Sequence, residues 1–423
     1  MNPLPGFRDF YPDDCAKKNH ILEHWRKTAT RYGFAEYDGP TLESVEVYKK
    51  KSGGELVGQL FDFIDKGDRH VALRPEMTPT LARMVVAKER EFKKPMKWFC
   101  APSFFRYEKQ QRGRLREFLQ LNCDIIGDPS EHADAELLAL VIDVLRDLGL
   151  SDSDFVVRLS DREAWTTFAA RHQITGDQFA TFLALIDKLE RMSPQEASAK
   201  LAPFNLSLDQ IHSFIENPGD ASPRLNAIIQ NLDARGLRNY VQTDLTIVRG
   251  LAYYTGMVFE VFDRAKNERA LAGGGRYDTL IETMSDGRIR LPALGFGMGD
   301  VVLSNLIEET PTALAQRNAW LASASALDAF VILAAPERAN DALAIIQLLR
   351  DAGLRTDYGA PGEKVGKQFQ AAEHKRATHA VVIGAEFPAL KVKHLASRTE
   401  TDATPQTLIQ TLRLPAPPAR TRE

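Results

Sequence analysis

The sequence predicts an α+β core built on an antiparallel sheet, interrupted by a helical insertion and followed by a smaller C-terminal α/β domain. Three observations predict this fold. Strand-like segments flank a charged hairpin loop at residues 107–116. Residues 161–238 are rich in Ala, Leu, Asp and Gln at helical spacing. Beyond residue 328, strand and helix patterns alternate, which is typical of βαβ units and a small parallel sheet.

The core is predicted from segments on both sides of the insertion. Helices are expected over residues 14–33, 78–91 and 132–148, the last of which ends at Gly149. The expected strands cover residues 34–37, 71–73, 97–106, 117–127, 240–248 and 258–262. Residues 294–307 predict a strand that passes through glycines into a helix.

The C-terminal part predicts strands over residues 329–333, 354–358 and 380–383, with helices over 338–352 and 364–376. The division of the chain that we expect is a core (1–160 and 239–310), the helical insertion (161–238), a linker that is partly helical (311–327), the C-terminal domain (328–414) and a disordered tail (415–423).

Composition excludes several classes of protein. The net charge of −3 over 423 residues means that any nucleic-acid contact must come from a local patch. The three cysteines, Cys15, Cys100 and Cys123, form no CxxC pair, which argues against a disulfide framework or a zinc ribbon. Their scarcity, and an N-terminus without signal-peptide features, predict a reducing, cytoplasmic location. No apolar run is long enough to span a bilayer, so no membrane partner is expected.

The central chemical signal is the pair of short motifs around the hairpin loop. Phe105-Arg106-Tyr107-Glu108 precedes the loop and Arg116-Glu117-Phe118 follows it. A guanidinium at a strand end can fork onto a phosphate, and an aromatic ring offers a flat face to adenine. The motifs therefore suit ATP. The alternative is a hairpin with a solvated, charged turn and no ligand.

Taken with other segments, these motifs resemble the class II aminoacyl-tRNA synthetases, and most closely the histidyl-tRNA synthetase family. Residues 105–118 resemble the second signature motif of the class, and residues 33–43, with Pro40, resemble its first motif, which builds a dimer interface. Residues 73–78 resemble the family's amino-acid-binding turn. Its two histidine signatures are similar to residues 248–256 and 272–278. The C-terminal domain is similar to the family's anticodon-binding domain. The resemblance covers residues 5–412.

The resemblance implies a histidine–tRNA ligase that activates L-histidine with ATP and transfers it to tRNA(His). It also implies a homodimer. Glu76 matches the family's carboxylate for the ammonium group of histidine, and Met77 and Thr78 stand in the same turn. Gln120 matches a position near the amino-acid backbone. The positions that face or line the imidazole pocket are Asp124, Tyr253, Tyr254 and Tyr277. A site that pairs with both ring nitrogens can reject other amino acids.

Two arginines carry the implied chemistry. Arg106 and Arg249 match the family's grip on the α-phosphate and carboxylate, where guanidinium groups stabilise the charge that develops during attack on ATP. The implied ATP-binding residues are Arg106, Glu108, Arg116 and Phe118. Mg²⁺ is expected to bridge phosphate oxygens, with no protein side chain assigned as its ligand.

Two positions depart from the family pattern. Ala252 replaces an aspartate in the histidine signature, and Val302 stands where the third class II motif has the arginine that contacts the ATP γ-phosphate. We expect Val302 to pack between helix and sheet. The arginines considered as substitutes for the missing contact are Arg114, Arg116, Arg288 and Arg290.

A basic stretch marks the C-terminal domain. Residues 364–398 hold seven Lys or Arg against two acids, in a chain of net charge −3. A solvated helix face explains such a stretch about as well as RNA does, but the implied domain type favours RNA phosphate. The expected tRNA-binding residues are Lys364, Lys367, Lys375 and Arg376.

The rival hypothesis is a regulatory, non-catalytic function. Paralogues of the family serve as non-catalytic regulatory subunits of ATP phosphoribosyltransferase, and generally lack the anticodon domain. The Val302 departure favours this rival slightly, whereas the C-terminal domain and the intact Arg106, Glu108, Arg116 and Arg249 favour the synthetase more. A third and weaker alternative is a tRNA-binding protein that no longer aminoacylates. The HxxEH pattern from His20 to His24 and the glycine spacing at residues 295–299 are weak matches to a zinc site and a dinucleotide fingerprint.

Overall fold

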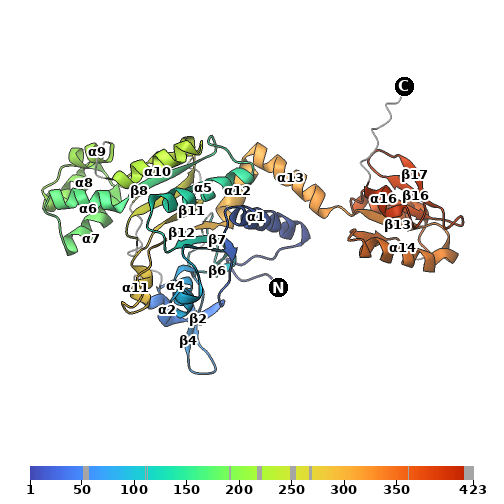
Figure 1. Cartoon of the computed structure of the whole chain (residues 1–423), viewed down its shortest axis with the longest axis horizontal. Helices are drawn as coiled ribbons and strands as arrows, with labels where there is room; N and C mark the ends of the chain where they lie inside the picture. Colours follow the sequence, from blue (N-terminus) through green and yellow to red (C-terminus); the bar gives the residue numbers. More distant parts are fainter. Residues whose placement is uncertain are drawn as a thin grey trace. The chain divides into compact units, whose positions relative to one another are not determined.

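A nine-stranded, mostly antiparallel sheet lies at the centre of the unit Met1–Arg317 (Figure 1). Among the strand pairs that the structure describes in this sheet, only β1–β5 and β8–β9 are parallel. The order across the sheet is β1 (Ala35–Glu36), β5 (Met96–Cys100), β7 (Glu117–Ile126), β12 (Ala293–Gly299), β11 (Ala272–Arg276), β10 (Met257–Asp263), β8 (Phe155–Asp161) and β9 (Val241–Thr243), with β6 (Ser103–Phe105) paired to β7. The predicted α+β core on an antiparallel sheet is confirmed.

The computed structural model of the chain describes residues 1–50, 57–109, 111, 113–189, 192–216, 222–247, 254–265, 269–360 and 362–413. None of the helices within these ranges is long and apolar enough to cross a membrane. The expected tail at residues 415–423 lies outside them.

Three helices pack around the sheet. α5 (Glu131–Asp147) begins at Ser130, whose hydroxyl accepts a hydrogen bond from the Ala133 amide, and its leucines and valines are fully buried. α1 (Pro12–Arg31) packs on α5 and buries Trp25 completely. α12 (Asp300–Glu309) follows β12 directly and buries Val302 and Leu303 in the main hydrophobic core.

Helices fill the segment between β8 and β9. They are α6 (Arg162–Arg171), α7 (Asp177–Ile186), α8 (Pro194–Leu201), α9 (Leu208–Glu216) and α10 (Pro223–Ala234). Trp165, Phe168, Phe182 and Phe214 pack together there, with ring centroids 4.5–6.1 Å apart. These rings belong to the same hydrophobic core as the central sheet.

A small antiparallel sheet, ordered β2-β4-β3, precedes the hairpin. It consists of β2 (Leu42–Ser44), β4 (His70–Leu73) and β3 (Phe61–Ile64), and α2 (Val45–Lys49) and α4 (Thr78–Lys88) lie beside it in sequence. Only β4 and α4 were expected from the sequence, because the other strands are short and mostly exposed. This sheet leads the chain from Leu73 into the turn at Arg74, Pro75 and Glu76.

The unit Asn318–Glu423 contains a five-stranded sheet ordered β14-β13-β15-β16-β17. Its strands are β13 (Ala329–Leu333), β14 (Thr356–Tyr358), β15 (His379–Ile383), β16 (Leu390–His394) and β17 (Glu400–Ala403), and its helices are α14 (Ala339–Asp351), α15 (Val365–His374) and α16 (Leu408–Arg413). The first three strands are parallel, but β16 and β17 are antiparallel. The three expected strands therefore form the expected small parallel sheet, and the unexpected strands β16 and β17 extend it in the antiparallel direction.

One strand expectation needs correction. The strand expected at residues 240–248 is only β9, because Asp244 bonds to Thr246 and pairs with Arg158, which turns the chain away from the sheet edge. The stretch expected as a partly helical linker contains the 15-residue helix α13 (Pro311–Ser325).

One buried carboxylate joins three elements of the first unit. Arg276 at the end of β11 donates to Oδ1 of Asp134 on α5 at 2.7 and 2.9 Å, and both side chains are almost fully buried. Arg224 of α10 donates to Oδ2 of Asp134 at 2.5 Å. Arg276 also donates to the carbonyl oxygens of Asp128 and Ser130. The sheet, α5 and the helical segment therefore share one hydrogen-bonded charge network.

We expect Arg276→Ala to lower the free energy of unfolding by about 3 kcal/mol, because it leaves a buried carboxylate with one of its two cations. The matched control is Arg146→Ala, which removes a half-exposed arginine paired with Asp143 at 2.7 Å and should cost less than about 1 kcal/mol. Urea unfolding of both variants measures the difference. Equal losses would show that the buried network stabilises no more than a surface pair.

His20 is expected to make the stability of the first unit depend on pH. Its ring on α1 is fully buried, 4.4 Å from the ring of His24, and burial together with the charges of His24 and Arg317 lowers its pKa from 6.5 to about 4. The unfolded chain therefore binds a proton more readily than the folded one. Stability should fall as the pH drops from about 6.5 to about 4, by up to about 3 kcal/mol.

The test compares wild type with His20→Phe, which keeps a buried ring and removes the titration. Urea unfolding at pH 7 and pH 4.5 should show a smaller loss of stability in the variant. An identical loss in both proteins would mean that His20 does not carry this pH dependence.

Candidate active site

One face of the central sheet carries a row of polar side chains beside a strip of glycines. On β7, Gln120, Asn122 and Asp124 point to the same face because side chains alternate along a strand. Their partners on β12 are Gly299, Gly297 and Gly295. The next strand, β11, places Gly273 and Gly275 opposite Gly297 and Gly295, and β10 places Glu260 opposite Gly273.

The glycines leave the room that the polar side chains occupy. A Cβ atom at Gly295 would lie 2.0 Å from Asp124 Oδ1, and one at Gly297 would lie 2.7 Å from the carboxamide carbon of Gln120. A Cβ atom at Gly275 would meet the Tyr254 ring at 2.9 Å. Any larger residue would push these groups off the sheet, so the glycines allow the polar side chains to lie flat against the backbone.

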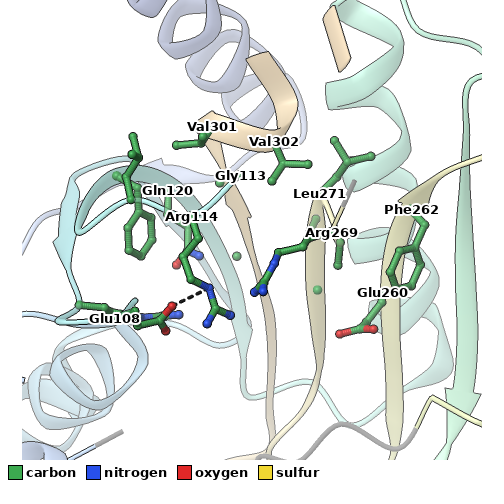
Figure 2. Close-up of a pocket in the computed structure, with 18 residues that line it drawn as sticks. Glu108, Gly113, Arg114, Gln120, Glu260, Phe262, Arg269, Leu271, Val301 and Val302 are labelled. Atoms are coloured by element: carbon green, nitrogen blue, oxygen red, sulfur yellow. Dashed lines mark ion pairs between the residues drawn. The ribbon is translucent and has the colours of Figure 1, made fainter. Parts of the chain in front are cut away.

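A cavity of about 820 Å³ opens on this face. Gln120 and Glu260 line it on opposite sides, and Figure 2 shows Glu108 and Arg114 on the side of the hairpin loop. Three of the four expected ATP-binding residues, Arg106, Glu108 and Phe118, line it as well. Its volume suits a ligand of nucleotide size.

Backbone contacts hold Arg106 in place. Its Nε donates to the Pro75 carbonyl oxygen at 2.9 Å, and its guanidinium carbon lies 5.2 Å from the centre of the Phe118 ring. Pro75 is held in turn by Arg74, a buried arginine that donates to Ser103 O and Gly39 O and pairs with Asp38. The expected phosphate-binding arginine is therefore preorganised by the same turn that carries Glu76.

Arg116 does not line the cavity. Its guanidinium stacks 4.2 Å from the Tyr107 ring centre and makes 3.4 Å hydrogen bonds to the carbonyl oxygens of Glu108 and Pro5. Arg114 does line the cavity and pairs with Glu108 at 2.5 Å. The structure therefore brings the loop arginine 114, rather than Arg116, to the ligand face.

Of the expected histidine-binding residues within the described ranges, Gln120 lines the cavity, and most of the others fall into two groups outside its lining. Asp124 is 2% exposed and accepts a hydrogen bond from the hydroxyl of Tyr277, and Tyr254 packs in the same hydrophobic cluster as Tyr277. Glu76 is buried in the turn before α4, and Thr78 begins that helix. The Met77 side chain packs against Phe104 and Cys100 in the core, so only its backbone can face a ligand. Arg249, Ala252 and Tyr253 lie outside the described residues.

Val302 both packs in the core and borders the cavity. Its side chain is 7% exposed and belongs to the main hydrophobic cluster, as expected. The start of its helix is fixed by Asp300, which accepts hydrogen bonds from the Leu119 amide and from Arg8. Burial raises the pKa of the Asp300 carboxyl, although Arg8 opposes the shift.

Two of the arginines considered as substitutes at this end do not line the cavity. Arg288 donates to the Ser285 carbonyl oxygen, and Arg290, whose side chain is 82% exposed, pairs with Glu282.

Sequence reasoning missed three polar residues at the site: Asn122, Glu260 and Arg269. The alternation along β7 already placed Asn122 on the same face as Gln120 and Asp124. Glu260 is a carboxylate in the otherwise apolar run Met257–Phe262. Arg269 lines the cavity from the segment before β11 and had no signal beyond its closeness to the glycine motif.

The basic stretch of the second unit is partly neutralised. Lys375 pairs with Asp357, and Lys391 pairs with Glu400 and Asp402, all three acids lying outside the stretch counted in the sequence. Within the part of this unit that the structure describes, no ion pair involves Lys364 or Lys367, and both are exposed. Arg376 follows α15 and is also exposed.

Comparisons with known proteins agree with this arrangement. A family model described as histidyl-tRNA synthetase matches residues 6–299, and one described as anticodon binding domain matches residues 328–413. The histidine–tRNA ligase of Opitutus terrae is 40% identical over 94% of this chain and 95% of that protein. That of Halobacterium salinarum is 36% identical over 95% of each.

The fold comparison gives the same result. The crystal structure of histidyl-tRNA synthetase from Nostoc sp. has the same fold, with a TM-score of 0.77 over 98% of both chains at 23% identity. With one family model covering the sheet that bears the cavity and a second covering the C-terminal unit, the chain belongs to the histidyl-tRNA synthetase family.

Proposed function

We propose that this protein is a histidine–tRNA ligase, which activates L-histidine with ATP and transfers it to tRNA(His). The observation that carries the proposal is the continuity of the cavity face. Phe118 and the polar row from Gln120 to Asp124 follow one another along β7, over a strip of glycines, and Arg106 directly follows β6, the strand paired with β7. Such an arrangement can hold a nucleotide and an amino acid end to end.

Histidine would be recognised by charge and by ring hydrogen bonds. The buried carboxylate of Glu76 suits the ammonium group, since a buried cation needs a carboxylate partner. Asp124, fixed by the Tyr277 hydroxyl, suits an imidazole N–H, and Asn122 on the same face adds a second polar group. Tyr254 and, from the resemblance, Tyr253 would enclose the ring.

In the activation step, a carboxylate oxygen of histidine attacks the α-phosphorus of ATP, and pyrophosphate leaves. Negative charge grows on the α-phosphoryl oxygens, and Arg106 is held in advance by Pro75 to stabilise it. Arg249 is proposed as the second such group, on the resemblance alone. The α-phosphate end thus depends on rigid guanidinium groups of this chain.

Mg²⁺ is proposed to accompany ATP. No cluster of three or more His, Cys, Asp or Glu side chains suited to a metal ion occurs among the described residues. Mg²⁺ in nucleotide sites is usually held by phosphates, waters and one or two carboxylates, and Glu108 and Glu260 both line the cavity. When bound, the ion would neutralise phosphate charge.

The C-terminal unit supports tRNA charging over the regulatory-subunit alternative. The anticodon-binding family model matches residues 328–413, and the histidine–tRNA ligases compared above align over nearly their whole length. Lys364, Lys367 and Arg376 are the first choice for phosphate contacts, and Lys375 follows because it is already paired. A homodimer and a cytoplasmic location remain predictions from the first motif and the cysteine content.

The primary prediction is that the purified protein catalyses pyrophosphate–ATP exchange only when L-histidine, ATP and Mg²⁺ are all present. Asp124→Ala should raise the KM for histidine at least about tenfold, because a buried ring N–H loses its acceptor. The exchange rate with each of the other amino acids is the control. Comparable exchange with another amino acid would refute the histidine assignment, and no exchange at all would favour the regulatory alternative.

The second prediction concerns the basic stretch. Lys364→Ala/Lys367→Ala should weaken binding of tRNA(His) and reduce the slope of log affinity against log salt by about 2, because two phosphate contacts are lost. The matched control, Lys375→Ala/Lys391→Ala, removes two lysines that are held by acids and should change the slope less. Histidine-dependent exchange should be unchanged in both. Equal slopes in the two variants would place the RNA contacts elsewhere.

A further inference from the structure

The pyrophosphate end of the cavity lacks the cation expected of the third class II motif. Val301 and Val302 form this part of the wall, so the helix that normally supplies an arginine presents apolar groups. The leaving pyrophosphate carries several negative charges, and a site that binds ATP must neutralise them with groups from elsewhere.

Arg269 lies close to Val302, the position at which the third class II motif has an arginine. The Gly299 amide, at the end of β12 and three residues before Val302, donates to the Leu271 carbonyl oxygen at 3.3 Å. Arg269 is two residues before Leu271, so it enters the cavity next to the start of α12. In Figure 2, its guanidinium points away from Leu271 into the cavity, on the side that faces Arg114.

A side-chain contact ties Arg269 to the hairpin loop. Its guanidinium donates to the carboxamide oxygen of Gln111, which lies three residues from Arg114 in the loop. This hydrogen bond brings the segment before β11 and the loop after β6 together over the cavity. Arg269 therefore stands at the meeting point of the two segments that flank the phosphate end.

The other arginines are less well placed for the same role. Arg114 shares the cavity but is held by Glu108 at 2.5 Å, on the hairpin side. Arg116 binds backbone carbonyl oxygens, and Arg290 pairs with Glu282 away from the cavity lining. Of the described arginines that line the cavity, Arg269 is the one two residues from Leu271, whose carbonyl oxygen accepts the hydrogen bond from Gly299 at the end of β12.

We propose that Arg269 binds the β- and γ-phosphates of ATP and so replaces the arginine that is absent at position 302. This inference rests on the proposed function. As histidine attacks, a new O–P bond forms and the bond from the α-phosphorus to the bridging oxygen breaks, with its electron pair leaving on pyrophosphate. Arg269 stabilises that leaving group, while Arg106 serves the α-phosphate.

The test compares Arg269→Ala with two matched variants. Gln111→Ala breaks the same hydrogen bond but keeps the charge, and Arg290→Ala removes an exposed arginine of the same unit. Calorimetry of the full chain measures the Kd of ATP and of AMP without histidine. Arg269→Ala should weaken ATP about 10- to 100-fold and AMP less than about twofold, the loss expected of one charged hydrogen-bonding partner.

Exchange kinetics supply a second readout. In Arg269→Ala, the KM for pyrophosphate should rise by a similar factor while the KM for histidine stays within about twofold, and Arg269→Lys should recover part of the loss. Arg290→Ala should match wild type in both assays, and Gln111→Ala should keep most of the preference for ATP over AMP.

Three results would overturn the proposal: equal weakening of ATP and AMP in Arg269→Ala, an unchanged ATP affinity in that variant, or a loss in Gln111→Ala as large as in Arg269→Ala. The last would make Arg269 a positioning residue for the loop. A wild-type protein without histidine-dependent exchange would refute the proposed function alone, because the comparison of ATP with AMP needs no histidine and still decides the role of Arg269.

Discussion

A Cβ atom at Gly295 would overlap the Asp124 carboxylate, and one at Gly297 would overlap the Gln120 carboxamide. The middle of the sheet must therefore stay free of side chains if the polar row of β7 is to lie flat on it. This constraint fixes where functional groups can come from. They stand on β7 and β10, on either side of the glycine strip, or on the loops at its ends. The close-packed hydrophobic core on the opposite face of the sheet then keeps the strands rigid, because the glycines themselves provide no side-chain packing.

The residues whose placement could be predicted from the sequence are those whose direction follows from the backbone. Gln120 and Asp124 share a face because strand side chains alternate, and Arg106 and Phe118 flank a hairpin. The directions of Arg116 and Arg269 depend instead on tertiary partners, a tyrosine ring for one and Gln111 for the other. The direction of a long, flexible side chain cannot be predicted from the local sequence.

The fold shows the same limit. The long helices α1, α5 and α14 were expected because apolar residues recur at helical spacing over several turns. The strands β16 and β17 were not: the lysines of β16 were assigned to the basic stretch although they alternate with apolar residues as in a half-buried strand, and β17 is almost wholly polar. Glu400 and Asp402 of β17 pair with Lys391. Because β17 was not expected, the positive charge available to RNA was overestimated from the sequence.

The strands β8 and β9 are parallel neighbours, with Leu159 opposite Thr243. Parallel neighbours cannot be joined by a tight turn, so the chain must cross over between them, and α10, packed on α5 and β8, provides that crossover. α6 is anchored as well, through the Trp165 indole and the Leu245 carbonyl oxygen. The helices α7 to α9 thus connect α6 to α10, and both of these helices are anchored to the rest of the unit. Phe182 of α7 and Phe214 of α9 pack on Trp165 of α6 in the main core, so replacing this whole stretch would uncover α6 even if the strand order stayed the same.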